Sequence, residues 1–537
     1  FYEMRQKLGV KVFDGAIKLR TLQTAKEEGR IVMAAEELSL VAGGDSANIQ
    51  RDLMKRFSSR TGLTCLFFLL FSIQIAISAG SYSGRHSPPM FGDFEAQRHW
   101  MEITVNLPLK QWYVNGSDND LSYWGLDYPP LTALHSYILG KISEEIDPSW
   151  VALFKSRGVE SESHKLFMRL SVLVSMWILY IPAIVTFVYL SSCDQKVYYS
   201  AVAVLYPALI AMDNGHFQYN HISLGLFLLA VICFIRSWRV AGSIFFVMAV
   251  NFKQMELYHS LPVAVFLLAT SLPPIYNAKN LCRSFTELAK LLVVVVSTFL
   301  LLWSPFIASG ADLKQIMHRI FPFYRGIFED KVANVWCTVN VVIKLNKYHN
   351  THLLKLSTAL VICTHIPSLC ALFLRPSISM FKRTLFISSL SFFLFSFQVH
   401  EKSILLPAVA ALLIWPERRV AISWFLIISN ASVFPLCVKD GNALHLAMFI
   451  SYAVILYPNF SKLTPLQWLV VQSSCAIGVT VCIASVVVSP PTRYPHLFSL
   501  FNAVFCFIHF AALFAYFNYV VVKECYVCGR DRREKLH

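Results

Sequence analysis

Apolar residues form long continuous stretches in this chain, and polar residues gather in the short segments between them. Most of the apolar runs have roughly 15–25 residues, the length that a helix needs to cross a bilayer. Because lipid offers no hydrogen-bond partner to the backbone, such runs predict helices. About fourteen runs are visible, and two or three are short enough for re-entrant or half-helices. They cover residues 63–79, 167–190, 197–212, 222–235, 241–250, 257–272, 288–308, 353–374, 385–397, 404–415, 420–438, 443–457, 468–488 and 497–522.

This pattern predicts an all-α polytopic membrane protein with about 11–14 transmembrane helices and a large polar first loop. Five segments follow in order. They are an N-terminal extension (1–60) to which we assign no function, a first transmembrane helix (61–80), the first loop (81–166), a multispanning domain (167–522) that includes a second loop (310–352), and a tail (523–537). The run 63–79 is interpreted as a retained signal anchor, because a long segment precedes it and no convincing cleavage site follows.

Lys and Arg in the short connections predict the orientation of the helices. One set of turns, together with the tail, holds roughly sixteen cations, and the opposite turns hold about four, which places the first set in the cytosol. The cytosolic set includes Arg236, Arg239, Lys279, Arg283, Arg375, Lys382, Arg383, Arg418, Arg419 and Arg530, whereas the opposite set is Lys253, Lys402, Lys439 and Arg493. The first loop, the 213–221 turn, the second loop and the 400–402 turn therefore share the non-cytosolic face. A polar surface assembled from separate pieces of chain is typical of a functional site.

Composition narrows the function classes. The chain is 56% hydrophobic, against about 45–50% for a soluble domain. Its net charge of +15 does not indicate a nucleic-acid partner, because the cations lie between apolar runs and form no patch. No phosphate-binding glycine motif is present, so an activated substrate is expected from the membrane. The pair Cys525 and Cys528 stands alone and is interpreted as unpaired juxtamembrane thiols.

Two sequons test the orientation. Asn115 lies in the first loop, on the non-cytosolic face, and is a candidate for glycosylation. Asn459 falls in a predicted cytosolic turn and is expected to stay unmodified.

In the first loop, ionisable residues are most concentrated in the stretch GDFEAQRHW (92–100). In a helix, Asp93 and Gln97 share one face, as do Glu95 and His99. Two carboxylates near an arginine and a histidine suit general-base work, with the arginine free to orient a carboxylate or phosphate. A capping and salt-bridge cluster explains the same residues equally well. Both interpretations stay open from the residues alone.

Other polar pieces of the same face carry weaker signals. The Asp118–Asp120 run lacks the spacing of a calcium loop, so a structural turn is favoured. The aromatic residues around Asp127 and Tyr128 suit sugar rings, or a belt at the membrane interface. His216, Gln218, His400 and Lys402 stand where spans meet, and ionisable residues there are functional candidates, although a snorkelling lysine is the simpler reading of Lys402. Arg325 belongs to a stretch (321–337) suited to a phosphate or to an interfacial helix. The histidines match no metal motif, so no metal is expected.

Together, the motifs GDFEAQRHW, YWGLDYPPLTA, HFQYN, FPFYRGIFEDKVANVWC and VHEKSIL resemble the endoplasmic reticulum dolichyl-phosphate-glucose glucosyltransferases of asparagine-linked glycosylation. The resemblance begins near Ser81 and does not cover the N-terminal extension. It implies a GT-C type glycosyltransferase fold in the endoplasmic reticulum membrane with a lumenal active site. The GDFEAQRHW and FEDKVAN forms are similar to the branch that adds the first glucose to the nine-mannose lipid-linked oligosaccharide.

The resemblance also implies partners and roles. The donor is dolichyl phosphate glucose, the acceptor is the dolichyl-pyrophosphate-linked oligosaccharide, and no cofactor is expected. A β-linked donor and an α-1,3-linked product imply inversion, which needs one general base, and Asp93 takes that role. The remaining assignments are Glu95, Arg98, His99 and Trp100 to hold the base, Asp127 and Tyr128 to order the loop or meet sugar, His216 and Gln218 to contact glucose, and His400, Lys402 and Arg325 to bind the donor phosphate.

Two alternatives remain. One is the related branch that adds the second glucose. The other is a polytopic lipid or sugar transporter, although transporters tend to show two related halves with broken helices, which this chain does not.

Overall fold

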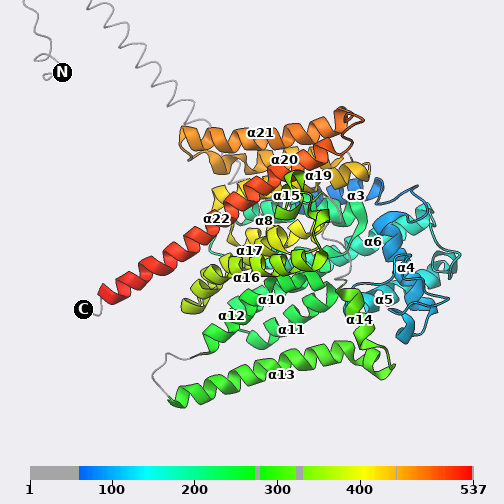
Figure 1. Ribbon diagram of the computed structural model, residues 1–537, viewed down its shortest axis with the longest axis horizontal. Coiled ribbons are helices and arrows are strands. Elements are labelled where there is room, and N and C mark those ends of the chain that lie inside the picture. Colours follow the sequence, from blue (N-terminus) through cyan, green and yellow to red (C-terminus); the bar gives the residue numbers. More distant parts are fainter. Residues whose placement is uncertain (1–59, 273–277, 322–330, 443, 535–537) are drawn as a thin grey trace, which may run out of the picture. The chain divides into compact units, whose positions relative to one another are not determined.

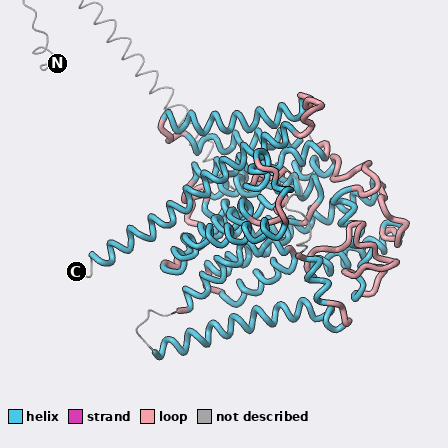
Figure 2. Tube along the Cα trace, viewed as in Figure 1, coloured by secondary structure: helices cyan, strands magenta, loops and turns pink. Residues whose placement is uncertain are grey.

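The computed structural model describes residues 60–272, 278–321, 331–442 and 444–534. The chain divides into two units, Phe1–Thr64 and Cys65–His537, and of the first only the opening turn of helix α3 (Arg60–Ala79) is described. The second unit contains helices and loops, and no strand occurs in its described part (Figure 2). Arg325 and almost all of the N-terminal extension lie outside the described residues.

Every predicted apolar run forms helix (Figure 1). The helices are α3, α6 (Glu162–Ser175), α7 (Ile181–Leu190), α8 (Lys196–Val204), α9 (Pro207–Ile210), α10 (Asn220–Ile235), α11 (Arg239–Phe252), α12 (Ser260–Ser271), α13 (Ala278–Ala308), α16 (Asn350–Leu374), α17 (Ile378–Phe395), α18 (Leu405–Ile414), α19 (Arg419–Lys439), α20 (Leu444–Leu456), α21 (Pro465–Val487) and α22 (Leu497–Glu534). Among the described residues, eight segments are long and apolar enough to cross a membrane, and three apolar helices are shorter. The prediction of an all-α polytopic protein is confirmed.

Several predicted runs give helices shorter than the roughly 17–25 residues that span a bilayer. The run 197–212 breaks between α8 and α9, where Pro207 supplies no backbone donor and restricts the residue before it. The runs 257–272 and 404–415 give α12 and α18, which have 12 and 10 residues. Helices α10, α11 and α20 are also short, with 16, 14 and 13 residues, so more runs are short than the two or three expected.

Burial separates inner helices from outer ones. On α17 and α18, Leu385, Phe386 and Leu412 are fully buried, and these two helices pack against each other. On α13, Leu292 and Leu301 keep 64% and 72% of their surface exposed. Apolar area exposed to water costs roughly 25 cal/mol per Å², so an apolar face of this extent suits lipid.

The polar loops fold onto one end of the second unit. Helices α4 (Gly92–Asn106), α5 (Pro130–Ile146) and α14 (Leu313–Ile320) lie together there (Figure 1). They share a core in which Trp100 and Ile103 of α4 meet Ile316 of α14. The remaining short helices are η1 (Leu109–Gln111), η2 (Pro148–Trp150), η3 (Met176–Tyr180), η4 (Ala211–Phe217), η5 (Gln254–His259), α15 (Val335–Val342), η6 (Leu345–Lys347), η7 (Glu401–Ile404) and η8 (Tyr457–Phe460).

Cations predicted to be cytosolic also gather together. Arg383 at the start of α17 bonds Glu417 at 2.9 Å, and it also contacts Glu524 of α22. Arg418 bonds Glu524 at 2.9 Å. Because these contacts join the starts of α17 and α19 to α22, the charged turns assigned to one face do lie near one another.

The two sequons differ in their surroundings. Asn115 is exposed, whereas the Asn459 amide donates hydrogen bonds to Tyr198 at 3.0 Å and Ser423 at 3.1 Å. We expect a glycan at Asn115 and none at Asn459 when the chain is made in cells that glycosylate proteins. Digestion with a glycosidase should shift the wild-type band and the Asn459→Gln band, but not the Asn115→Gln band. A glycan at Asn459 would reverse the predicted orientation.

Candidate active site

Asp93 stands in the first turn of α4, the position where a helix best stabilises an anion. The chain enters this helix through Gly92 with φ of 75°, a conformation that glycine adopts without strain. A Cβ atom on Gly92 would lie 2.7 Å from Ser83 Oγ, which is too close. The same Ser83 hydroxyl accepts a hydrogen bond from the Asp93 backbone N–H at 3.2 Å. Local sequence thus fixes the backbone of Asp93 against the start of the first loop.

The 211–217 segment brings a second piece of chain to Asp93. This segment, η4, is a π-helix, a form found frequently at functional sites. The buried Arg169 guanidinium fixes it by donating to the carbonyl oxygens of Asn214 and Gly215. Phe217 has φ of 90°, a strained conformation that costs on the order of 1–3 kcal/mol. The strained residue lies between His216 and Gln218, whose side chains both reach Asp93.

Asp93 Oδ2 collects three partners from distant parts of the chain. The Lys402 ammonium and the Gln218 amide both donate to it, and His216 Nε2 lies 3.1 Å away. On its other side, His216 Nδ1 lies 2.6 Å from a carboxylate oxygen of Asp440, which follows α19. The Asp93 side chain keeps 21% of its surface exposed, so it remains open to a ligand.

Electrostatics keep Asp93 ionised. Burial acts to raise the pKa of its carboxyl, but the charges of Lys402 and His216 hold the pKa well below its usual range. Burial and Lys402 act to lower the pKa of His216, yet the two carboxylates of Asp93 and Asp440 raise it above its usual value. The site therefore pairs a carboxylate with two groups that bind its charged form.

A pocket of about 590 Å³ opens beside Asp93, within the usual range for ligand sites of about 300–1,000 Å³. Its wall includes Asp93, Gln97, Trp100, Trp124, Asp127, Tyr128, Gln218, Asn220, Lys253, Gln254, Tyr258, Arg319, His400 and Lys402. The rings of Trp100 and Tyr128 lie 5.0 Å apart, and aromatic faces suit the apolar side of a sugar ring. The pocket thus joins a carboxylate, cations and aromatic rings.

Besides Asp93, six residues expected at the site line the pocket: Trp100, Asp127, Tyr128, Gln218, His400 and Lys402. His216 contacts Asp93 without lining the pocket. Glu95, Arg98 and His99 do not line it, and Arg325 lies outside the described residues.

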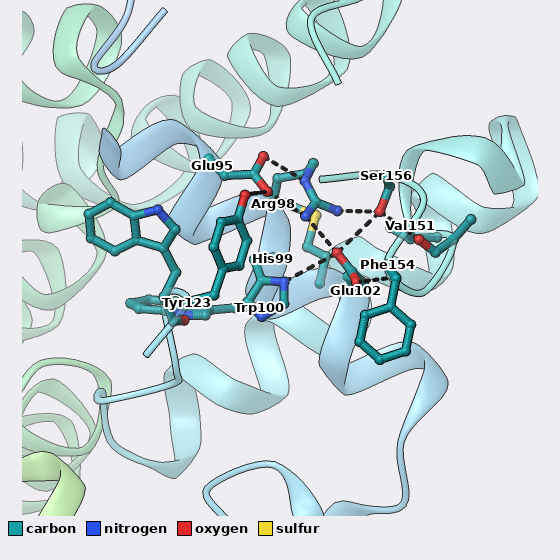
Figure 3. Close-up of polar contacts among 12 residues, drawn as sticks. Glu95, Arg98, His99, Trp100, Glu102, Tyr123, Val151, Phe154 and Ser156 are labelled. Carbon is teal, nitrogen blue, oxygen red and sulfur yellow. Dashed lines mark hydrogen bonds and ion pairs between the residues drawn. The ribbon is translucent and has the colours of Figure 1, made fainter. Parts of the chain in front are cut away.

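Glu95, Arg98 and His99 belong instead to a buried network on the opposite face of α4 (Figure 3). The Arg98 guanidinium donates to Glu95 at 2.6 Å, to Glu102 at 2.5 Å and to Ser156 Oγ at 2.5 Å. His99 Nδ1 lies 3.2 Å from Glu102. Arg98 and His99 have no exposed surface, so they are closed to a ligand in this structure. Here the salt-bridge interpretation describes the arrangement, and these three residues can hold the base only by fixing α4.

Helical spacing explains this division. Asp93, Gln97 and Trp100 recur at intervals of four and three residues and face the pocket, whereas Arg98 and Glu102 point away from it. The second face holds α4 against the 150–156 loop, because Glu102 also accepts the Phe154 N–H at 2.8 Å. Burial acts to raise the pKa of Glu102, but His99 and Arg98 lower it to about 2, so the network stays charged.

The first loop is also fixed farther from the site. The Asn119 amide donates to the carbonyl oxygens of Gln111 at 2.9 Å and Trp112 at 3.1 Å. Asp120 accepts the Ser122 N–H at 2.9 Å. These are the contacts of a structural turn, which is the interpretation favoured for the Asp118–Asp120 run. Within the described ranges, no three His, Cys, Asp or Glu side chains group as metal ligands.

Sequence reasoning missed two residues of the site. Lys253 entered the analysis only as a charge for predicting orientation, yet it lines the pocket. Asp440 was not singled out, and it orients His216. Their positions in the sequence could have indicated them. Each residue directly follows an apolar run and lies on the predicted non-cytosolic face.

The fold and the site together define a polytopic membrane enzyme with an acid–base site where its polar loops meet the helices. Residues 64–517 match the family described as the ALG6, ALG8 glycosyltransferase family. The chain belongs to this family and is a glycosyltransferase, as the resemblance of its motifs predicted.

Three relatives support this assignment. A Caenorhabditis elegans protein named probable dolichyl pyrophosphate Man9GlcNAc2 alpha-1,3-glucosyltransferase is 47% identical over 451 residues, covering 84% of this chain and 88% of the relative. The Gallus gallus dolichyl pyrophosphate Man9GlcNAc2 alpha-1,3-glucosyltransferase is 42% identical, with coverages of 86% and 96%. The Saccharomyces cerevisiae protein of that name is 37% identical, with coverages of 85% and 90%.

The buried network makes a stability prediction. Replacing Arg98 by Met leaves Glu95 and Glu102 buried without their cation, which should lower the free energy of unfolding by about 3–5 kcal/mol. A denaturant titration in detergent micelles measures this. Lys155→Met removes an exposed cation from the same loop and should leave the transition unchanged. An Arg98→Met protein as stable as the wild type would mean that the network does not hold α4.

Proposed function

We propose that this protein transfers the first glucose from dolichyl phosphate glucose to the nine-mannose dolichyl-pyrophosphate oligosaccharide. The product has an α-1,3 linkage, and the reaction inverts the anomeric carbon. The enzyme is proposed to act in the endoplasmic reticulum membrane with its site facing the lumen. The names of the three relatives favour this acceptor. One observation carries the proposal above all: Asp93, held ionised by Lys402 and His216, opens onto a pocket lined with aromatic rings and cations.

The proposed chemistry is a single displacement. An acceptor hydroxyl attacks the anomeric carbon of glucose, and its proton passes to the Asp93 carboxylate. The bond between the anomeric carbon and the phosphate oxygen breaks, and its electron pair leaves with dolichyl phosphate. Inversion requires only this one step and one base. The leaving group is a phosphate, which is already a good anion, so it needs cations more than a proton donor.

Other pocket residues have complementary roles in this proposal. The rings of Trp100 and Tyr128 receive sugar, Gln218 orients the base, and His400 and Lys402 stand on the wall where the donor phosphate leaves. Lys402 contributes in two ways. It keeps Asp93 ionised before reaction, and it becomes available to phosphate as Asp93 takes the proton.

Replacement of Asp93 tests the base. Asp93→Asn keeps the size of the side chain and one acceptor oxygen but cannot accept the proton, so we expect transfer to fall by about 10²–10⁴-fold. The measurement is transfer of labelled glucose from synthetic dolichyl phosphate glucose to the nine-mannose acceptor by purified protein. Asp118→Asn, in an exposed turn of the same loop, is the matched control and should stay active. Near-normal transfer by Asp93→Asn would remove the base from this scheme, and an inactive wild-type protein would remove the proposed function.

The pH dependence tests the pairing of Asp93 with Lys402. Cations lower the pKa of a carboxyl, so removal of Lys402 raises the pKa of Asp93 and moves the acid limb of kcat/KM to higher pH. We expect Lys402→Met to shift that limb upward by about 1–3 pH units relative to the wild type. The pH at which kcat/KM falls on the acid side is compared, and not its maximal value, because the variant also loses affinity for the donor. An unchanged limb would mean that Lys402 does not set the charge of Asp93.

A further inference from the structure

Lys253 is a cation of the pocket wall whose partners are all neutral. It follows α11, and its ammonium donates to Asn220 Oδ1 and lies 3.3 Å from Gln218 Oε1. The ring of Tyr128 lies 5.1 Å from the ammonium, in the geometry of a cation–π contact. None of these groups carries a negative charge.

Two other cations near the site have carboxylate partners. Lys402 pairs with Asp93, and Arg98 pairs with Glu95 and Glu102. No carboxylate of the described residues forms an ion pair with Lys253. Burial and the charge of Lys402 lower the pKa of Lys253 to about 8, although the carboxylates of Asp213, Asp93 and Glu256 act to raise it. These carboxylates therefore do not fully offset the cost of burying the ammonium. An anion in the pocket is the partner that would supply the remaining stabilisation.

The charge of the donor fits this arrangement. Dolichyl phosphate glucose is a phosphodiester with one negative charge, and the pocket wall has one ammonium that no described carboxylate contacts. We propose that Lys253 forms the phosphate subsite of the glucose donor, and that it binds the phosphodiester while Lys402 still pairs with Asp93. This inference rests on the proposed function, because it takes its ligand from that reaction.

Charge then stays balanced through the reaction. Before transfer, the two ammoniums of Lys253 and Lys402 face one phosphodiester charge and the Asp93 carboxylate. During transfer, Asp93 accepts the acceptor proton and becomes neutral, while the departing phosphate gains a second negative charge. Lys402 loses its counter-charge at the moment when the leaving group needs another cation. Groups aimed at charge that develops in the transition state are the most effective kind of electrostatic catalyst.

Gln218 links the two halves of this arrangement. Its amide nitrogen donates to Asp93, and its amide oxygen accepts from Lys253. The two ends of an amide are a donor and an acceptor, so this pairing fixes the orientation of the side chain. One residue therefore sets the spacing between the base and the proposed phosphate subsite.

Direct binding of dolichyl phosphate tests this subsite without requiring transfer. We expect Lys253→Met to weaken binding of dolichyl phosphate to the purified protein by roughly 10- to 100-fold, the effect of losing one charge-assisted hydrogen bond. Lys253→Arg, which keeps the charge, should bind within about fivefold of the wild type. Lys141→Met, which removes an exposed lysine from the first loop, should bind normally. Wild-type affinity in a Lys253→Met protein with an unchanged melting curve would overturn the proposal.

Two further measurements, the pH dependence of binding and transfer by the wild type, distinguish a failure of the subsite from a failure of the proposed function. If Lys253→Met does not fold, the pH dependence decides: affinity of the wild type should fall as pH rises through the titration of Lys253, and affinity of Lys253→Arg should not. The same pH profile for both proteins would overturn the proposal. Transfer by the wild type is measured in parallel with the nine-mannose acceptor. Failure of that transfer removes the proposed function, whereas normal transfer with unchanged donor KM in Lys253→Met removes only the subsite.

Discussion

The ion pair between Asp93 and Lys402 is the contact on which the rest of the site depends. It joins residues 309 positions apart in the chain and brings the first loop onto a turn between two inner helices. Two charges taken partly out of water are tolerated only when each is well paired and further hydrogen bonds complete the arrangement. His216 and Gln218 provide those bonds to Asp93, and Asp440 completes the environment of His216. The same pairing holds the proposed base ionised and keeps a cation beside the proposed path of the leaving phosphate.

Several residues around the site adopt strained backbone conformations. Trp124, Phe217 and Gln398 all have positive φ, and all three lie in or directly beside residues that line the pocket. Such conformations persist only where the surroundings enforce them. The hydrogen bonds of Arg169 hold η4, which contains Phe217. The buried ion pairs of Arg98 hold α4 in place beside the pocket. Rigid support of this kind suits a reaction whose catalysis depends on fixed charges.

Much of the fold was predictable because its signal is local. Each apolar run became helix, since run length and hydropathy alone decide whether a segment suits a bilayer. Asp93 was the residue chosen as base, and its carboxylate lines the pocket with Lys402 and Gln218. Its catalytic role stays a prediction. The buried contacts of Glu95, Arg98 and His99 were not predictable, because their type and spacing suit either face of a helix. Only the packing of α4 against the 150–156 loop separates the two faces.

The sequence by itself determined an all-helical membrane protein whose polar segments share one face, and it singled out a carboxylate in the first loop. Periodicity and charge distribution reveal this because they depend on neighbouring residues. Tertiary structure decided which cations Asp93 meets, which charges of α4 are buried, and that no described carboxylate contacts Lys253. These properties arise from contacts between residues 35 to 309 positions apart, and the state of a charged group depends on what folding places around it.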